Sequence, residues 1–311
     1  MSNDSTITVD NRTLRVGNLE KVFFPDDGIT KGDLIDYYTR IAETMLPHLR
    51  DRPLSLQRFP DGIEEEGFYQ KEIPDYFPNW IGRTQVTVKA DRHSQAQVVA
   101  GDAPTLAYLA DQGVVTLHGW LSRAERLDYP DKLIFDLDPP GDDFEQVRAA
   151  AFLLRDILRE LDLAPFVMTT GSRGLHVVIP LNAEAEFDSV RSFAKGCAQL
   201  LAHRHPNRLT TETRKGKRQG RLFLDYLRNA YGQTGVIPYS VRARPGAPVA
   251  APLDWDELQD SSLTSRSYTL KNIFRRLGQK ADPWQTFARY GVSLTEADKK
   301  LREALKDAGV N

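Results

Sequence analysis

The sequence predicts an α+β fold in which an antiparallel sheet is backed by two helices, and three observations lead to it. The expected elements between residues 132 and 226 follow the order β-α-β-β-α-β. Segments 144–161 and 189–203 carry apolar residues at helical spacing with charges on the opposite face. Strands 166–169 and 175–179 are separated only by a short glycine-containing loop. This order is the split βαβ pattern, in which the first strand is central.

The composition is ordinary for a globular protein with a full core. The chain has 311 residues, 41% of them hydrophobic and 27% charged, which suits one large domain or two small ones. The net charge of −2 does not by itself indicate a nucleic-acid binding protein, but basic residues cluster at 214–221 and 242–244. The single cysteine, Cys197, excludes an internal disulfide, fits a reducing cytoplasm and falls in an apolar helical stripe, as a buried structural thiol would.

No apolar run is long enough to cross a bilayer, and the polar start Met1–Asp4 is unlike a signal peptide. We therefore expect a cytoplasmic protein without a membrane partner.

The first 125 residues are expected to alternate short strands and helices. Residues 6–24 suggest one or two strands, and Thr30 is a plausible N-cap for a helix that Pro47 ends. Strand 54–59 should carry Arg58 outward. The other expected elements are strands 85–89, 97–100 and 114–117 and a helix at 105–111 in this part, and an extended segment 236–241 with helices 269–277 and 294–308 near the end.

Two aspartates end the strand that begins at Lys132. Asp136 and Asp138 are two residues apart, so their side chains share one face of the strand. Carboxylates at the end of an apolar strand suit a divalent cation bound for phosphate chemistry. A strand running into an acidic loop is an equal alternative at this point, because Asp142 and Asp143 follow.

A third carboxylate and a glycine loop add to this candidate site. Asp225 ends the apolar strand 222–225, and the split βαβ topology can bring it beside Asp136 and Asp138. Three carboxylates on adjacent strands can hold two metal ions about 3.5–4 Å apart for in-line phosphoryl displacement. The loop 170–176 predicts a tight turn whose backbone N–H groups face outward as a phosphate nest.

Three segments carry a family resemblance: 135–139 (FDLDP), 171–176 (GSRGLH) and 223–229 (FLDYLRN). They resemble, in order, the three motifs of archaeo-eukaryotic primase-type polymerases, and among these the polymerase domain of bacterial ATP-dependent DNA ligase D. The resemblance covers about residues 13–277. It implies a primase-type fold with an RRM-like catalytic palm and an N-terminal α/β portion. It also implies a template-directed nucleotidyltransferase that extends primers and fills gaps in non-homologous end joining, favours ribonucleotides, and uses two Mn²⁺ or Mg²⁺ ions.

The resemblance also implies roles for individual residues. Asp136, Asp138 and Asp225 would be the catalytic metal ligands. Residues that would hold the incoming nucleoside triphosphate (NTP or dNTP) are Ser172, Arg173, His176, Arg242, Arg244, Arg58, Gln233 and His118. Asn18, Lys21 and Lys31 would surround the 5′-phosphate of a downstream strand, and Phe68 and Tyr69 would stack on the template. Two positions depart from the family pattern, which commonly has Ser and Lys where this chain has Thr170 and Arg173.

The same resemblance sets expectations for organisation and partners. Residues 1–311 would form a single polymerase domain, with an N-terminal portion at 1–125, a catalytic palm at 126–255 and C-terminal helices at 256–311. The chain would be one part of a longer protein with ligase and nuclease domains. Its partners would be DNA with gaps, overhangs or 5′-phosphorylated ends and a Ku-type end-binding protein, at the bacterial nucleoid.

Two other functions compete with the polymerase. A metal-dependent phosphohydrolase would use Asp136 as nucleophile. Such enzymes have a threonine or valine shortly after Asp-x-Asp, whereas this chain has Pro139 and Pro140 there. A non-catalytic nucleic-acid binding module would gain only repulsion from three carboxylates near phosphate.

Overall fold

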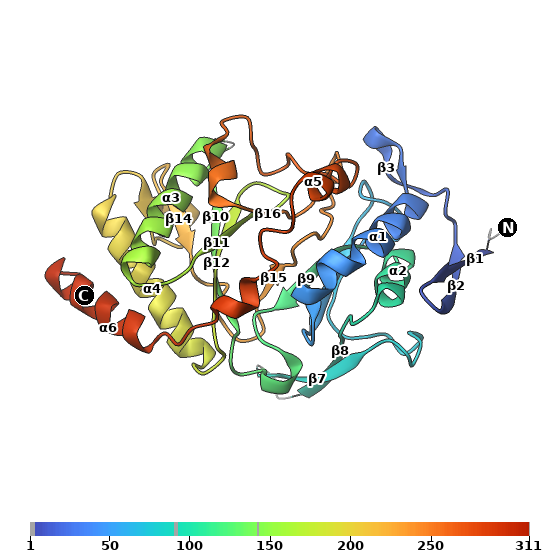
Figure 1. Cartoon of the computed structure of the whole chain (residues 1–311), viewed down its shortest axis with the longest axis horizontal. Coiled ribbons are helices and arrows are strands. Elements are labelled where there is room, and N and C mark those ends of the chain that lie inside the picture. The colour runs from blue at the N-terminus through green and yellow to red at the C-terminus, as the bar shows by residue number, and fades with distance from the viewer. Residues whose placement is uncertain (1–3, 90–92, 142, 311) are drawn as a thin grey trace. The chain divides into compact units, whose positions relative to one another are not determined.

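The computed structural model describes residues 4–89, 93–141 and 143–310, so Asp142 and the start Met1–Asn3 lie outside the described residues (Figure 1). The chain divides into two compact units. The first comprises Met1–Glu125, Thr234–Ala250 and Tyr268–Lys280, and the second Arg126–Gln233, Ala251–Ser267 and Ala281–Asn311. Within the described residues, no helix combines the length and apolarity that a membrane crossing requires.

The second unit is built on a six-stranded sheet in the order β13-β14-β10-β12-β11-β16. Its strands are β10 (Lys132–Asp138), β11 (Phe166–Thr169), β12 (Leu175–Pro180), β13 (Leu209–Thr210), β14 (Leu222–Asp225) and β16 (Pro252–Leu253). Its helices are α3 (Phe144–Glu160), α4 (Phe187–Arg204) and α6 (Thr295–Asp307), with short 3-10 turns at Lys215–Lys217, Trp255–Gln259 and Phe287–Tyr290. The order β14-β10-β12-β11 is the split βαβ arrangement predicted from the sequence, with β10 central.

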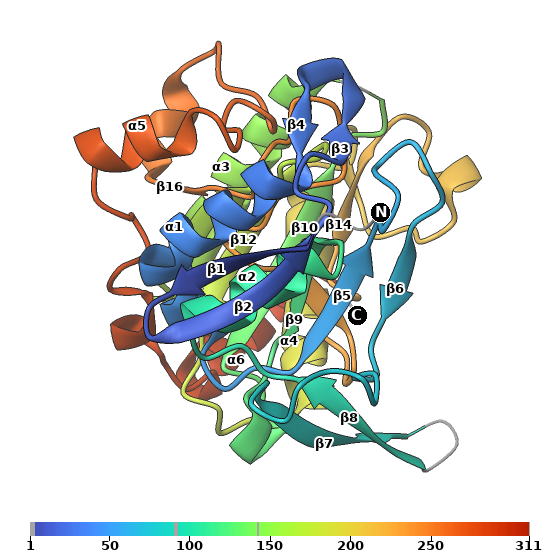
Figure 2. The same cartoon turned by 90° about the vertical axis from the view of Figure 1, so that its right-hand side faces the viewer.

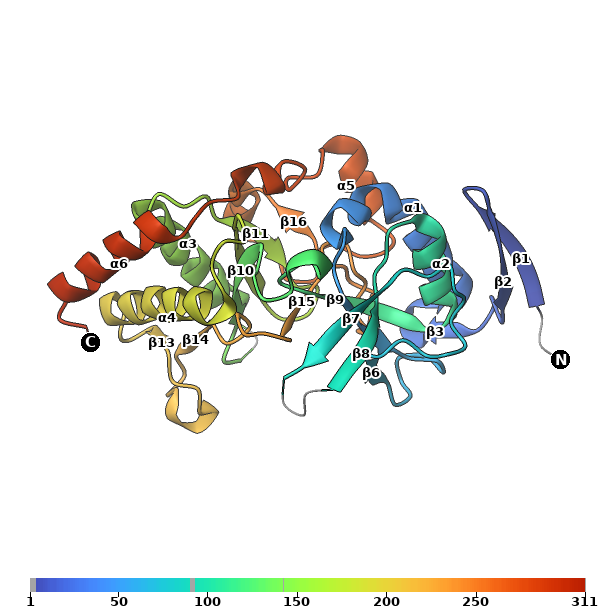
Figure 3. The ribbon, with the colours of Figure 1, turned by 90° about the horizontal axis from the view of Figure 1, so that it is seen from below.

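Helices α3 and α4 pack on the sheet through their apolar stripes (Figure 1). Asp143 caps α3 by accepting a hydrogen bond from the Glu145 N–H. Helix α6 lies along α4 (Figure 3), where a Cβ at Gly196 would meet Leu301 at 3.0 Å. Cys197, also on α4, is fully buried, and this burial raises the pKa of its thiol, so the predicted structural role is confirmed.

The last residue of the 223–229 segment, Asn229, joins β10 to the segment after β14. Asn229 is fully buried, accepts a hydrogen bond from the Ile134 N–H at 2.9 Å, and donates to the Ile134 carbonyl at 2.7 Å and the Tyr226 carbonyl at 2.9 Å. These bonds lie at the point where the β10–β14 ladder has ended. Asn229 therefore satisfies backbone groups of β10 that no strand reaches.

The first unit contains a four-stranded sheet in the order β15-β9-β5-β6 and three two-stranded sheets, β1-β2, β3-β4 and β7-β8 (Figure 2). Its strands are β1 (Asp4–Val9), β2 (Arg12–Gly17), β3 (Val22–Phe24), β4 (Ile29–Thr30), β5 (Leu54–Arg58), β6 (Phe68–Gln70), β7 (Arg83–Val88), β8 (His93–Val98), β9 (Val114–Trp120) and β15 (Thr234–Val236). Its helices are α1 (Lys31–Leu49), α2 (Ala103–Asp111) and α5 (Ile273–Gln279), with a 3-10 turn at Pro25–Asp27.

Helix α1 confirms one prediction about its ends and contradicts another. Thr30 is the N-cap and forms a capping box with Asp33. Pro47 does not end the helix, which continues to Leu49. A proline lacks one backbone N–H, but the Arg50 N–H still donates to the Leu46 carbonyl at 3.0 Å, so the last turn closes around it.

One expectation about a side chain in the first unit was wrong, because Arg58 does not point outward but is only 8% exposed. The strand expected at 114–117 is longer than predicted: β9 continues through His118 to Trp120 and pairs with β15. Phe68 and Tyr69 are both exposed on β6, the edge strand of its sheet.

The remaining differences concern where elements begin and end. Residues 6–24 contribute three strands, the segment expected to be extended over 236–241 is strand only up to Val236, and the helix expected at 269–277 begins at Ile273.

We predict that Asn229→Ala lowers the free energy of unfolding by about 2–4 kcal/mol, because three buried hydrogen bonds are lost at about 1 kcal/mol each and backbone groups are left unpaired. Urea denaturation followed by circular dichroism measures it. Asn207→Ala, at an exposed asparagine of the same unit, is the matched control and should change little. A loss below about 1 kcal/mol for Asn229→Ala would contradict the assigned role.

Candidate functional site

The centre of the candidate site is Asp136 on β10. It pairs with Asp225 on β14 and with His176 on β12 as directly opposite residues of antiparallel strands. Side chains of such partners share one face of the sheet, and Asp138, two residues further along β10, shares that face too. Asp136 is 7% exposed and His176 4%, whereas Asp138 is exposed. The three predicted carboxylates therefore lie together in the second unit.

Two side chains, Arg228 and His176, contact the carboxylate of Asp136. Arg228 approaches Oδ2 with both Nε and Nη2 at 3.1 Å, and Nε2 of His176 lies 3.5 Å from Oδ1. Burial alone would raise the pKa of Asp136, but His176 and then Arg228 outweigh it and hold the pKa at about 2. Asp136 is therefore ionised at every physiological pH.

The other two carboxyl groups are less well compensated. Burial and then the charge of Asp136 raise the pKa of Asp138. Burial raises the pKa of Asp225 as well, although its Oδ1 accepts a hydrogen bond from the Leu227 N–H at 2.8 Å. The face of the sheet thus holds more negative charge than its own cations neutralise.

This donor set suits a divalent cation. Carboxylate oxygens are the ligands that Mg²⁺ and Mn²⁺ prefer. Among residues 4–89, 93–141 and 143–310, however, no three acidic, histidine or cysteine side chains already converge as a metal-binding group. Arg228 and His176 occupy the oxygens of Asp136. The chemistry and register of the carboxylates therefore fit a metal, while the Asp136 carboxylate is contacted by Arg228 and His176.

The turn between β11 and β12 is organised by the Thr170 hydroxyl. This oxygen donates to the Gly174 carbonyl at 3.1 Å and accepts from the N–H groups of Ser172 at 3.3 Å and Gly174 at 3.2 Å. Gly171 has a φ of +63°, which favours glycine. The expected nest of outward N–H groups is therefore wrong for Ser172 and Gly174, because the hydroxyl of Thr170 takes both.

The same turn packs directly against β10. A Cβ at Gly174 would lie 1.8 Å from the Leu137 carbonyl oxygen, so only glycine fits there. Arg173 donates through Nη2 to the carbonyls of Pro139 at 2.9 Å and Gly141 at 2.8 Å, in the loop after β10. Nδ1 of the buried His176 has no hydrogen-bond partner among the described residues.

Gln233, also expected to contact the nucleotide, is an exposed residue of the second unit. The other expected nucleotide residues, Arg58, His118, Arg242 and Arg244, belong to the first unit.

Arg58, Phe68, Tyr69 and His118 form one neighbourhood of the first unit. The Arg58 guanidinium lies 5.4 Å from the Phe68 ring centroid and donates to the side chains of Gln70 and Tyr76. Tyr69 meets His118 edge-on with ring centroids 5.7 Å apart. The exposed aromatic pair is thus backed by an arginine on one side and a histidine on the other.

The residues expected at a 5′-phosphate also lie together. The Lys21 N–H donates to the Asn18 carbonyl at 3.0 Å, and the Lys31 N–H donates to the Lys21 carbonyl at 2.8 Å. Lys21 is half-buried beside Asp61, whereas the Lys31 ammonium is buried, 2.7 Å from Asp111. Lys21 is therefore the more accessible of the two lysines.

Arg242 and Arg244 lie on the segment that follows β15. The Arg242 N–H donates to the Pro248 carbonyl at 2.7 Å, and the Arg244 N–H donates to the Arg242 carbonyl at 2.8 Å. Arg244 is exposed and lines a cavity of about 210 Å³ with Pro25 and Glu64.

Sequence reasoning missed two arginines that the structure places in the second unit's site. Arg228 falls within the third motif, three residues after Asp225, and that short spacing was the available signal. Arg266 donates through Nε to the Ser172 carbonyl at 2.7 Å, but it is 94 residues away in sequence and no local pattern points to it.

We predict that two single substitutions change stability in opposite directions without metal. Asp136→Asn removes a carboxylate whose pKa is lowered, so it should cost about 1–2 kcal/mol at pH 7. Asp138→Asn removes one whose pKa is raised, so it should stabilise, by less than about 1 kcal/mol because the group is exposed.

Thermal unfolding in EDTA between pH 7 and pH 2 measures both effects. The advantage of wild type over Asp136→Asn should fade as the pH falls from about 4 towards 2, the window between the unfolded and folded pKa values. The lower stability of wild type relative to Asp138→Asn should already disappear below about pH 4, where the Asp138 carboxyl is protonated in the folded and the unfolded protein alike. The same sign for both variants at pH 7 would contradict this charge distribution.

Known proteins are similar to this chain in sequence and in fold. The chain is 33% identical over 299 residues to the multifunctional non-homologous end joining protein LigD of Mycolicibacterium smegmatis, covering 94% of this chain and 39% of that protein. It is 32% identical over 278 residues to the bifunctional protein LigD of Bacillus subtilis, covering 89% of this chain and 44% of that protein. The chain thus spans about two fifths of the length of these relatives.

A solved structure gives the same result. The polymerase domain of Mycobacterium tuberculosis ligase D in complex with DNA matches with a TM-score of 0.83 and 31% identity, over 89% of this chain and 99% of that one. The family model for the LigD primase-polymerase domain matches residues 30–284. The predicted α+β primase-type fold and the predicted resemblance are both confirmed. The chain belongs to the LigD primase-polymerase domain family of nucleotidyltransferases.

Proposed function

We propose that this protein is a template-directed nucleotidyltransferase that extends primers and fills gaps at double-strand breaks during bacterial non-homologous end joining. The observation that carries the proposal is the position of Asp136, Asp138 and Asp225 on one face of the sheet, with the Thr170–Gly174 turn packed against the same strand. Three carboxylates beside a loop of nucleotide-binding type suit the transfer of a nucleotide to a primer 3′-hydroxyl.

Asp136, Asp138 and Asp225 would hold two divalent cations, Mn²⁺ or Mg²⁺. When bound, such ions lower the pKa of an attacking hydroxyl and stabilise the leaving pyrophosphate. The protein's part is to keep the carboxylates ionised and aligned. Arg228 and His176 do this for Asp136, because they hold its pKa at about 2. The preference for ribonucleotides is part of the proposal and rests on the family resemblance.

For the nucleoside triphosphate we propose the residues named from the resemblance. His176 lies opposite Asp136, and its Nδ1, which has no hydrogen-bond partner among the described residues, supports a ligand contact. Ser172 lies in the turn whose Gly174 packs against β10. Arg173 already binds two carbonyls, so it would contribute charge and hold the loop after β10. Gln233, Arg58, His118, Arg242 and Arg244 complete the proposed set.

The DNA contacts are proposed for the first unit. Phe68 and Tyr69 are exposed aromatic rings on an edge strand, which supports template stacking. Asn18, Lys21 and Lys31 would receive the 5′-phosphate of a downstream strand. We extend the proposal to one polymerase domain over residues 1–311, joined to ligase and nuclease domains and working with a Ku-type partner on DNA ends in the cytoplasm.

We predict that the wild-type protein adds labelled ribonucleotides to a primer on a 5′-phosphorylated gapped duplex with Mn²⁺ or Mg²⁺. Asp136→Asn with Asp138→Asn should reduce extension to background, because the metal ligands are lost. Asp307→Asn, an exposed aspartate at the end of α6, is the charge-matched control and should extend normally. Absence of extension by wild type, or equal extension by the double variant, would overturn the proposed function.

Metal binding can be measured through thermal stability, independently of primer extension. At 100 times its Kd, an ion stabilises the fold by about 2.7 kcal/mol, which corresponds to roughly 5–10 °C in Tm for a unit of this size. Mn²⁺ should produce such a rise in wild type and in Asp307→Asn. The Asp136→Asn, Asp138→Asn double variant should show almost none.

We predict that Lys21→Gln weakens binding to gaps bearing a 5′-phosphate by about 5–10-fold and binding to unphosphorylated gaps much less. Lys21 is the better test because Lys31→Ala would also leave the buried Asp111 without its cation and destabilise the fold. Fluorescence anisotropy with the two gapped duplexes measures the effect. Equal loss on both would leave Lys21 as a general backbone contact.

A further inference from the structure

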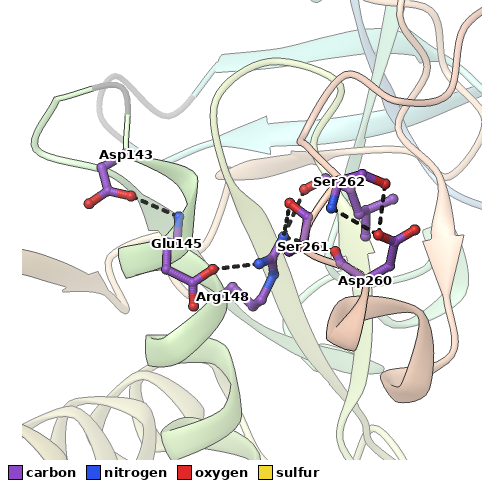
Figure 4. Close-up of polar contacts among 7 residues, drawn as sticks. Asp143, Glu145, Arg148, Asp260, Ser261 and Ser262 are labelled. Carbon is purple, nitrogen blue, oxygen red and sulfur yellow. Dashed lines mark hydrogen bonds and ion pairs between the residues drawn. The ribbon is translucent and has the colours of Figure 1, made fainter.

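Residues 260–267, here called the strap, form an ordered loop in the second unit. The Asp260 carboxylate accepts hydrogen bonds from the Ser262 N–H at 2.8 Å and the Ser262 hydroxyl at 2.7 Å (Figure 4). Further along, the Thr264 N–H donates to the Ser267 hydroxyl at 2.8 Å. The strap is therefore shaped by its own side chains.

A buried arginine fixes the strap to α3. Arg148 is 7% exposed, and its Nη2 donates to three carbonyls of the strap, those of Asp260 at 3.0 Å, Ser261 at 3.4 Å and Leu263 at 2.9 Å (Figure 4). Its Nη1 pairs with Glu145 one turn earlier on α3. Because α3 directly follows the loop after β10, the strap is tied to the start of that helix.

The far end of the strap binds the turn expected to hold the nucleotide. The Ser265 hydroxyl at 3.0 Å and Nε of Arg266 at 2.7 Å both donate to the Ser172 carbonyl. On its other side the turn is held through Arg173, which binds two carbonyls of the loop after β10. The turn is thus fixed from two sides.

Arg266 keeps its outer nitrogens available. The residue is exposed, its Nε is used by the Ser172 carbonyl, and its Nη atoms have no hydrogen-bond partner in the part of the chain that the structure describes. A guanidinium fixed at one nitrogen presents the others as a planar pair of donors, the arrangement that phosphate oxygens accept. Fixing the side chain beforehand also reduces the entropy lost on binding.

We propose that Arg266 is a further ligand for a phosphate of the incoming nucleoside triphosphate, held in place by the strap and by the Ser172 carbonyl. This inference rests on the proposed function, which puts the nucleotide at Ser172. On this inference the strap has a function. Arg148 holds the strap in place, and the strap positions the positive charge of Arg266 beside the Thr170–Gly174 turn.

The test is the affinity of the protein for a fluorescent ribonucleoside triphosphate with Mn²⁺, compared with the matching nucleoside without phosphates. Arg266→Gln should weaken triphosphate binding about 10-fold and leave nucleoside binding and Tm unchanged. Arg266→Lys, which keeps the charge but loses the planar pair, should fall between. Arg302→Gln removes an exposed arginine of α6 that pairs with Asp298, and it should bind as wild type does.

The inference is overturned by unchanged triphosphate affinity in Arg266→Gln, by an equal loss for the nucleoside, or by an equal loss in Arg302→Gln. If wild type extends primers and Arg266→Gln binds triphosphate normally, only this inference fails. If wild type neither binds triphosphate nor extends primers, the proposed function fails with it. Ser265→Ala removes the second donor to the Ser172 carbonyl without touching the charge, so a loss equal to that of Arg266→Gln would assign the effect to the position of the turn and overturn the phosphate contact.

Discussion

The pairing of β10 with β14 sets Asp136 directly opposite Asp225, and this like-charge pair constrains everything around it. Like charges opposite each other destabilise a strand pair. The second unit tolerates them because Arg228 pairs with Asp136, because His176 contacts the same carboxylate, and because Asn229 ties Ile134 of β10 to the segment after β14. The compensation is incomplete, since the pKa values of Asp138 and Asp225 stay raised. The second unit therefore keeps uncompensated negative charge on this face of the sheet, which favours binding of a cation from solution.

The turn between β11 and β12 is positioned by the same strand. Gly174 leaves no room between the turn and the Leu137 carbonyl, so the turn cannot move without β10. Thr170, which departs from the family pattern, supplies the hydroxyl that closes the turn. The carboxylates and the turn therefore behave as one rigid piece, which is the preorganisation that phosphoryl transfer requires.

Sequence patterns predicted the parts of the fold that depend on residues close to one another in the chain or on strand order. The strand order β14-β10-β12-β11, the third carboxylate Asp225 and the Thr30 cap all followed from periodicity, topology and capping chemistry. Burial of long polar side chains did not follow. Arg58 and Lys31 are buried because partners distant in sequence, Gln112 and Asp111, satisfy them, and no periodicity encodes such a pairing. The remaining nucleotide and DNA residues stay predictions from the family resemblance.

Three arginines of the second unit show why charge alone does not identify a ligand contact. Arg228 gives its charge to Asp136, and Arg173 gives its Nη2 to two backbone carbonyls, so each already has protein partners. Within the described residues, the Arg266 side chain uses Nε and keeps both Nη atoms open beside the same turn. An anion arriving at the turn can meet both Nη atoms of Arg266 together, whereas Arg228 and Arg173 each have Nη2 engaged with the protein. Binding is strongest where the donor is already fixed and still unpaired, so the arginine that sequence reasoning did not find is the one best prepared for phosphate.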